Sequence, residues 1–148
     1  MTARDTTTGS NYEAIIEMCI KRSCEKNNLG SIGQSTVGSK PGGGKHRVDW
    51  EIIDLKDMNN RGLISCKYQG TSGTAEEKMA YEVIKLLHTM KTDKRYKKGW
   101  VIMGGEGWST GMREFLNNHL QLWIPAMNDT IKILTTDQLI NEGISLTD

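Results

Sequence analysis

The sequence predicts an α/β fold in which a mixed central β-sheet is flanked by helices. Two stretches of alternating polarity, at 46–54 and 63–69, are typical of an antiparallel hairpin. An amphipathic helical pattern starts at Thr74, and the continuous apolar run 100–103 is typical of a buried central strand. The full element order expected is α-β-β-α-β-α-β-α.

The 148 residues suit one domain with its own core. We expect a flexible terminus over 1–9 and a single domain over 10–148. A first helix is expected at 11–26, where Ser10 and Glu13 have the spacing of a capping box. Residues 28–45 are rich in glycine and serine and are typical of a long loop, and 57–62 are typical of the polar turn of the hairpin.

The second helix has its own capping pair, Thr74 with Glu77, after a turn at 70–73. It is expected to end in a basic loop over 91–98. A helix at 112–120, a strand at 130–134 and a short helix capped by Thr135 or Thr136 complete the chain.

Composition excludes several classes of protein. The net charge is only +1, so a nucleic-acid partner would need local clusters of cations. Two clusters exist: Lys40, Lys45, His46 and Arg47, and then Lys91, Lys94, Arg95, Lys97 and Lys98. The three cysteines form no C-x-x-C pair and predict reduced thiols in a cytoplasmic protein. No apolar run is long enough to span a membrane, and neither 39–46 nor 104–107 has the spacing of a nucleotide-binding glycine motif.

The polar face of the hairpin carries the candidate chemistry. Asp49 lies on one strand, and Ser65, Lys67 and Gln69 alternate on the other. A simple salt bridge between Asp49 and Lys67 is one interpretation. Glu76 favours another, because its helical neighbours at i+3, i+7 and i+10 are apolar and turn it towards the sheet. Two carboxylates beside one lysine would suit Mg²⁺, with the lysine orienting an attacking water.

These residues resemble a known family. Val48-Asp49 followed by Ser65-Cys66-Lys67 is similar to the motif of the PD-(D/E)XK nuclease superfamily, which includes the restriction endonucleases. Lys67-Tyr68-Gln69-Gly70-Thr71-Ser72-Gly73-Thr74-Ala75-Glu76-Glu77-Lys78 also resembles a segment of restriction-type nucleases, as does the lead-in Gly42 to Asp49. The resemblance implies a restriction-endonuclease-like core.

The sequence departs from the motif at two positions. Val48 replaces a proline, and Ser65 replaces the usual Asp or Glu. The family has a Ser-x-Lys variant in which a glutamate of the next helix supplies the missing carboxylate, and this implies Glu76, with Glu82 as the fallback. A first-helix glutamate sometimes joins the metal site, which would be Glu13 unless capping accounts for it.

The resemblance implies a Mg²⁺-dependent DNA endonuclease, with Mn²⁺ as a substitute, that is restriction-type, nicking, homing or structure-specific. The expected catalytic residues are Asp49, Lys67, Glu76 and Gln69, the expected metal ligands are Asp49, Glu76 and Glu13, and the expected DNA contacts are Lys45, His46, Arg47, Lys78, Lys94 and Arg95. The alternative is an inactive DNA-binding or assembly module that keeps the fold, which Ser65 favours. A homodimer or a partner subunit is expected, because cleavage of two strands usually needs two sites.

Overall fold

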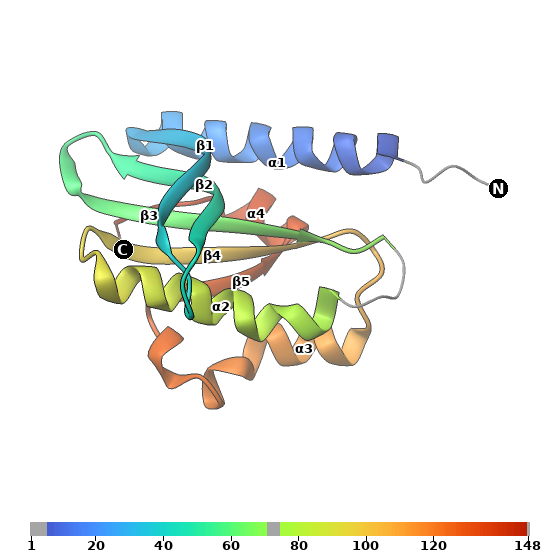
Figure 1. Cartoon of the computed structure of the whole chain (residues 1–148). Helices are drawn as coiled ribbons and strands as arrows, with labels where there is room; N and C mark the ends of the chain where they lie inside the picture. Colours follow the sequence, from blue (N-terminus) through green and yellow to red (C-terminus); the bar gives the residue numbers. More distant parts are fainter. Residues whose placement is uncertain (1–5, 71–74, 148) are drawn as a thin grey trace.

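The structure is a computed structural model that describes residues 6–70 and 75–147. One sheet contains the strands β1 (Leu29–Ser39), β2 (Lys45–Asp54), β3 (Asp57–Tyr68), β4 (Tyr96–Gly104) and β5 (Ile131–Thr135), in that spatial order. The helices are α1 (Thr6–Asn27), α2 (Ala75–Thr92), α3 (Thr110–Asn118) and α4 (Thr136–Glu142), with short 3₁₀ turns η1 (Leu120–Leu122) and η2 (Pro125–Met127). Figure 1 shows the long helices lying along the sheet. Residues 1–5 of the terminus expected at 1–9, residues 71–73 of the turn expected at 70–73, and the cap at Thr74 lie outside the described residues, whereas 6–9 belong to α1.

The sheet is mixed, as expected. β1, β2 and β3 are antiparallel neighbours, whereas β3, β4 and β5 are parallel. Each parallel step is made through a helix, α2 and then α3, because parallel strands need a long crossover connection. The predicted α/β fold class is confirmed.

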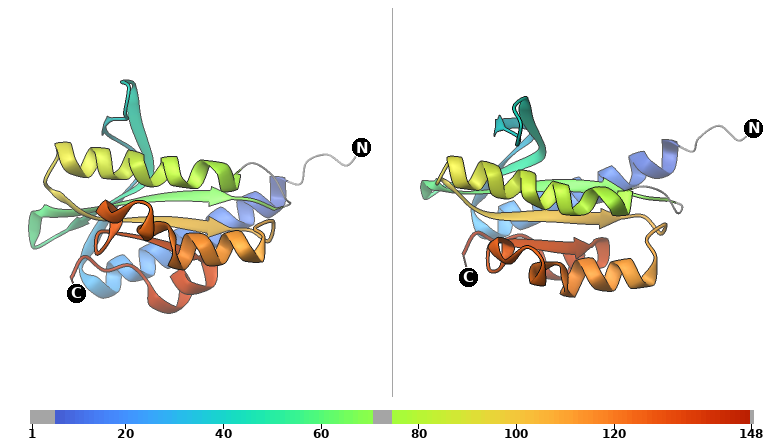
Figure 2. Two further views of the ribbon diagram at one scale, coloured as in Figure 1. Left: turned by 90° about the horizontal axis from the view of Figure 1, so that it is seen from below. Right: turned by 60° about the horizontal axis from the view of Figure 1, so that its bottom comes forward.

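The helices cover both faces of the sheet (Figure 2). α1 and α4 pack with Ile52, Ile64 and Ile102 in one buried cluster. α2 and α3 pack with Leu63, Val101 and Ile133 in a second cluster on the opposite face. Side chains that alternate along β3 therefore go to different clusters, which is the period of two expected for a central strand.

The loop expected at 28–45 is wrong, because residues 29–39 form the edge strand β1. Its glycines and serines have low strand propensity, but antiparallel pairing with β2 from Leu29↔Asp54 to Ser39↔Lys45 outweighs it. The ring of Trp50 covers Gly33, where a Cβ would stand 3.5 Å from it. Only 40–44 connect the two strands.

The turn expected at 57–62 is also wrong, since β3 begins at Asp57 and the hairpin turns at Leu55-Lys56. Arg61 is tied into the sheet by its backbone N–H, which donates to the carbonyl of Arg95. Pairing with neighbouring strands outweighs the turn propensity of Asn59 and Asn60.

α1 begins at Thr6, so Ser10 lies within the helix and is not its N-cap. Weak local helix propensity at 6–10 does not stop the helix, because the packing of its apolar face supplies most of its stability.

The starts of the two C-terminal helices can be compared with the expected ones. α3 starts at Thr110, earlier than expected, because the Ser109 side chain accepts from the Met112 N–H and caps it. Thr135 caps α4 in a capping box with Gln138, as one of the two alternatives predicted. In the part of the chain that the structure describes, no helix is long and apolar enough to cross a membrane.

Candidate active site

The hairpin opens into a fork, and Asp49 lies at that fork. The β2–β3 ladder ends at Trp50↔Ile64, after which β2 continues with β1 alone and β3 continues with β4 as far as Tyr68↔Gly104. Asp49 Oδ2 accepts a 2.7 Å hydrogen bond from the backbone N–H of Cys66. This bond occupies a β3 donor that β2 no longer pairs, and it fixes the aspartate beside the Ser65-Cys66-Lys67 segment.

Lys67 contacts an acid of α2, and that acid is Glu82. Lys67 Nζ lies 3.3 Å from Glu82 Oε2, and Lys85 Nζ lies 2.8 Å from the same oxygen. The Glu82 side chain is only 5% exposed, against 31% for Lys67. Burial alone would raise the pKa of Glu82, but Lys85 and Lys67 outweigh it and hold the pKa below its ordinary value. Glu82 is therefore a buried, ionised carboxylate.

Glu76 has a different neighbour. Its Oε2 accepts a 2.8 Å hydrogen bond from the backbone N–H of Ser109, at the start of α3. Glu82 is six residues further along α2, which is about 9 Å along the helix axis. The sequence favoured Glu76 over Glu82, but the acid that contacts Lys67 is Glu82. Helical phase alone did not reveal which turn of α2 lies over the lysine.

Glu13 approaches the fork from the opposite face of the sheet. Glu13 and Asp49 line the same groove of about 740 Å³, together with Cys66. Burial raises the pKa of the Cys66 thiol, and the charges of Asp49 and Glu13 raise it further, as expected where both acids lie near the sulfur. The capping interpretation of Glu13 fails because α1 starts at Thr6.

Gln69 is part of the framework. Its side-chain oxygen accepts from the N–H of Ala75 at the start of α2, and its Nε2 donates to the carbonyl of Gly107. The side chain is buried, and both of its polar atoms are engaged. The expected contact of Gln69 with phosphate or water is therefore replaced by a bridge between α2 and the segment before α3.

Ser65, the residue in place of the usual acid, is buried on β3. Its Oγ makes no hydrogen bond of ordinary geometry among the described residues, but the hydroxyl helps to hold the pKa of Glu82 down. A hydroxyl on so short a side chain is a weak substitute for a carboxylate ligand. The nearest acid on α2 is Glu82, which meets Lys67 two residues further along β3.

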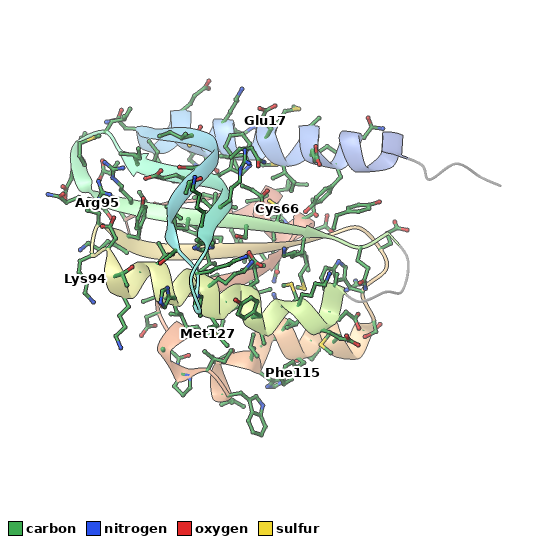
Figure 3. All side chains as sticks on the ribbon, viewed as in Figure 1. Glu17, Cys66, Lys94, Arg95, Phe115 and Met127 are labelled. Carbon is green, nitrogen blue, oxygen red and sulfur yellow. The ribbon has the colours of Figure 1, made fainter. Side chains whose placement is uncertain are left out.

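The expected DNA contacts divide into three groups. Lys45, Arg47, Lys78 and Lys94 are exposed. Arg95 is exposed but bound to Asp93, with Nη2 2.7 Å from Oδ2, and Figure 3 shows it with Lys94 at one end of the molecule, away from the central Cys66. His46 is buried, with Nδ1 2.6 Å from Thr89 Oγ1. The expected phosphate contact of His46 is wrong, because alternation along β2 turns its ring onto α2.

The donors at the fork are carboxylate oxygens, the class that Mg²⁺ prefers. Only Oδ2 of Asp49 has a hydrogen bond among the described residues, which leaves Oδ1 available. Within 6–70 and 75–147, no three His, Cys, Asp or Glu side chains form a cluster close enough to hold an ion without rearrangement. Asp49, Glu13 and Glu82 fit an ion by chemical type, and Glu82 would have to exchange lysine contacts for it.

Sequence reasoning missed Lys85. It completes the pair of cations on Glu82, and it lies three residues after Glu82 on α2. That i, i+3 spacing was the available signal. No salt bridge joins Asp49 to Lys67 among the described residues, and the simpler interpretation of the hairpin face is not supported.

Comparison with known proteins supports the fold. No curated protein matches the chain. A family model described as a PD-(D/E)XK nuclease superfamily domain matches residues 9–142, which include most of α1, the whole sheet and all of α4. The chain belongs to the PD-(D/E)XK nuclease superfamily.

Proposed function

We propose that this chain is a Mg²⁺-dependent DNA endonuclease that hydrolyses phosphodiester bonds at the β2–β3 fork. Membership of a nuclease superfamily supports the reaction class. The observation that carries the proposal is the contact between Lys67 and the buried Glu82 of α2. Lys67 lies on β3, the strand whose backbone Asp49 also contacts. The contact of Lys67 with Glu82 supplies the helix-borne acid that a Ser-x-Lys sequence otherwise lacks.

Each residue has a role in the proposed mechanism. Asp49, Glu82 and Glu13 would hold the ion, whose chemistry is to polarise the phosphoryl oxygen and make water a better nucleophile. Lys67 would orient the attacking water and neutralise charge that develops at phosphorus. Lys85 would keep Glu82 ionised and positioned, since it makes the shorter of the two contacts to Oε2. Cys66 contributes its backbone N–H, which orients Asp49.

Plasmid cleavage with and without Mg²⁺ tests the proposal. We expect Lys67→Ala to lose about 100-fold or more in rate, the usual size of a positioned proton-transfer or charge-stabilising group. Lys56→Ala is the matched control, because Lys56 is an exposed lysine at the far end of the same hairpin. Cleavage by Lys67→Ala at the wild-type rate would overturn the assignment.

The second candidate is a DNA-binding or assembly module without catalysis. Ser65 and the dispersed acids favour it. Calorimetric titration with Mn²⁺ separates the two, because an enzyme of this kind should take up the ion and Asp49→Asn should abolish uptake. A module would bind DNA without taking up metal in either form.

Two further expectations belong to this proposal. The three cysteines are free thiols, which fits the reducing cytoplasm. Double-strand cleavage by so small a domain would require a homodimer or a partner subunit, and light scattering on the DNA-bound protein measures this directly.

A further inference from the structure

Beyond the fork, β1 and β2 form a two-stranded arm, which we define as residues 35–47. It contains the end of β1, the connection 40–44 and the start of β2. In Figure 1 the arm crosses the sheet towards α2, and Figure 2 shows it projecting from the body of the molecule. Since β3 no longer pairs with β2 here, the sheet does not determine where the arm points.

The inner face of the arm is anchored to α2. Val37 and Val48 are buried in the cluster that contains the apolar stripe of that helix. His46, two residues before Val48 on β2, is bonded to Thr89. Nearer the tip, His88 Nδ1 lies 2.8 Å from the carbonyl oxygen of Ser39 and must donate to it, because a carbonyl only accepts. These contacts make the arm a preorganised element.

The outer face and tip are cationic. Lys45 and Arg47 are exposed and alternate with the buried His46 and Val48, and Lys40 is exposed at the tip. Residues 35–47 include no Asp or Glu. None of the three cations has an ion-pair partner within the described residues. A solvated face of ordinary composition mixes both signs of charge, so this one favours a polyanion.

The tip is thin. Gly42, Gly43 and Gly44 have φ values of 83°, 98° and 87°, a conformation that other residues rarely adopt. A Cβ at Gly42 or Gly43 would meet nothing within 4 Å, so packing does not require glycine there. The tip is therefore a bare backbone turn that can approach another molecule closely.

We propose that this arm enters the major groove of duplex DNA next to the cleaved bond, with Lys40, Lys45 and Arg47 on phosphates and base edges. The inference rests on the proposed function. A two-stranded ribbon fits a B-DNA major groove, which is about 12 Å wide. Lys45, Arg47 and Asp49 follow one another at alternate positions of β2, about 7 Å apart. Lys45 and Arg47 of the arm therefore lie on the same strand as Asp49 at the fork.

Fluorescence anisotropy with a labelled duplex in EDTA measures binding without cleavage. The variant Lys40→Ala/Lys45→Ala/Arg47→Ala should bind about 10- to 100-fold more weakly. The slope of log affinity against log salt should fall by about 0.9 for each phosphate that the variant no longer neutralises. Because all three side chains are exposed, the variant should fold, and its circular dichroism and urea midpoint establish this.

The matched control removes the same charge elsewhere. Lys21→Ala/Lys26→Ala/Lys56→Ala changes three exposed lysines on α1 and at the hairpin turn. We expect at most a twofold change in affinity. Equal losses of affinity in the control and arm variants would mean that net charge alone governs binding and would overturn the inference.

Methylation of guanine N7 tests the groove, since N7 lies in the major groove. It should weaken binding by the wild-type protein several-fold and have little effect on the arm variant. Interference only at adenine N3, in the minor groove, contradicts the inference, as does tighter binding to duplex RNA.

Cleavage assays on the same variants separate the two proposals. If the wild-type protein cuts DNA and the arm variant binds DNA normally, the proposed function stands and the proposed role of the arm is overturned. A wild-type protein that neither cuts nor binds duplex DNA refutes both.

Discussion

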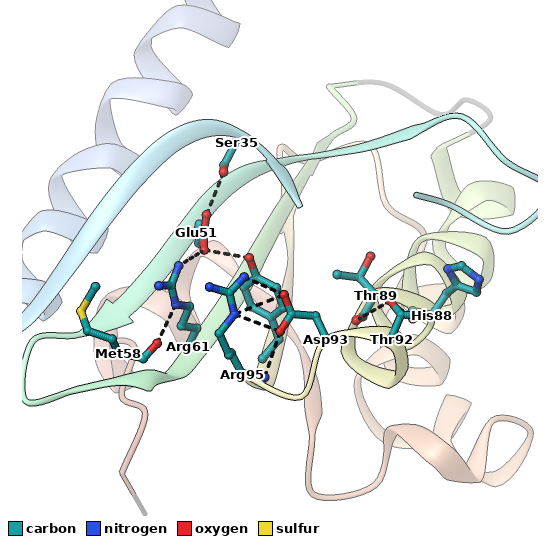
Figure 4. Close-up of polar contacts among 10 residues, drawn as sticks. Ser35, Glu51, Met58, Arg61, His88, Thr89, Thr92, Asp93 and Arg95 are labelled. Atoms are coloured by element: carbon teal, nitrogen blue, oxygen red, sulfur yellow. Dashed lines mark hydrogen bonds and ion pairs between the residues drawn. The ribbon is translucent and has the colours of Figure 1, made fainter. Parts of the chain in front are cut away.

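Glu51 is a buried acid near the fork that serves the fold, and Glu51→Gln is the prediction whose size follows most directly from the structure. Figure 4 shows its contacts. Glu51 Oε1 accepts from Ser35 Oγ at 2.8 Å, and Oε2 accepts from Arg61 Nη1 at 2.9 Å and Tyr96 Oη at 2.8 Å. One carboxylate on β2 thus ties together four neighbouring strands, β1 to β4.

The expected loss is about 3 kcal/mol of unfolding free energy. The side chains of Arg61 and Glu51 are 14% and 6% exposed, so this is a buried pair, and breaking one typically costs about 3–5 kcal/mol. The lower end applies because glutamine keeps one acceptor and because Arg61 Nε also donates to the Met58 carbonyl. For a domain of this size the loss corresponds to a fall of about 6–12 °C in Tm.

Urea unfolding at pH 7 without metal measures the loss. Glu25→Gln, an exposed acid of α1, is the control and should change stability by less than about 0.5 kcal/mol. A Glu51→Gln protein as stable as this control would refute the reasoning.

Acid provides a second check on Glu51. Burial would raise the pKa of Glu51, but hydrogen bonds from Tyr96, Ser35 and Arg61 outweigh it and hold the pKa below its ordinary value. A carboxyl whose pKa is lower in the folded state stabilises above the unfolded pKa and loses that contribution as pH falls. The difference between wild type and Glu51→Gln should therefore shrink below about pH 4.5.

Three further predictions concern single positions. Burial, with a smaller effect of Lys85, lowers the pKa of His46; Glu82 opposes this, whereas His88 and Lys40 add to it. As pH falls, the unfolded chain therefore binds a proton at His46 before the folded chain does, and the stability of the wild type should fall below about pH 6.5. The urea midpoint of His46→Gln should depend less on pH between about pH 5 and 7. Gly104→Ala should lose about 2 kcal/mol or more in thermal unfolding, because a Cβ there overlaps the Tyr12 ring; equal stability would contradict this packing. Ser65→Ala should raise the pKa of Glu82, because the Ser65 hydroxyl is one of the groups that hold that pKa down; NMR titration of the carboxyl measures it, and an unchanged pKa would contradict this reasoning.

The sequence was informative where residue periodicity and local chemistry agree. The alternation around Asp49 and Lys67 predicted the paired strands, and the apolar stripe of α2 predicted an inward position for Glu76, whereas Glu82 was placed one step off that stripe. The family resemblance predicted the fold that the family model supports. β1 was not predictable in this way, because its glycines acquire strand geometry only from pairing with β2.

The errors at the site have two different causes. Periodicity gives the face of a helix or strand that a residue occupies, but not its depth or its partner. Glu82 meets Lys67 because of how α2 packs along β3, which helical periodicity does not determine. His46 was counted among the exposed cations although it belongs to the alternate, inward face of β2. Tertiary contacts distinguish Glu82, whereas the alternation that His46 shares with Val48 already indicated its inward face.

The central claim is that Glu82, held beside Lys67, supplies the acid of a metal-dependent nuclease site. The most direct measurement is the Mg²⁺-dependent cleavage rate of plasmid DNA by Glu82→Gln and Glu76→Gln, at a temperature where both variants are shown to be folded. We predict a loss of about 100-fold or more for Glu82→Gln and less than about fivefold for Glu76→Gln, which can still accept from Ser109. Wild-type cleavage by Glu82→Gln, or loss only in Glu76→Gln, would contradict the account.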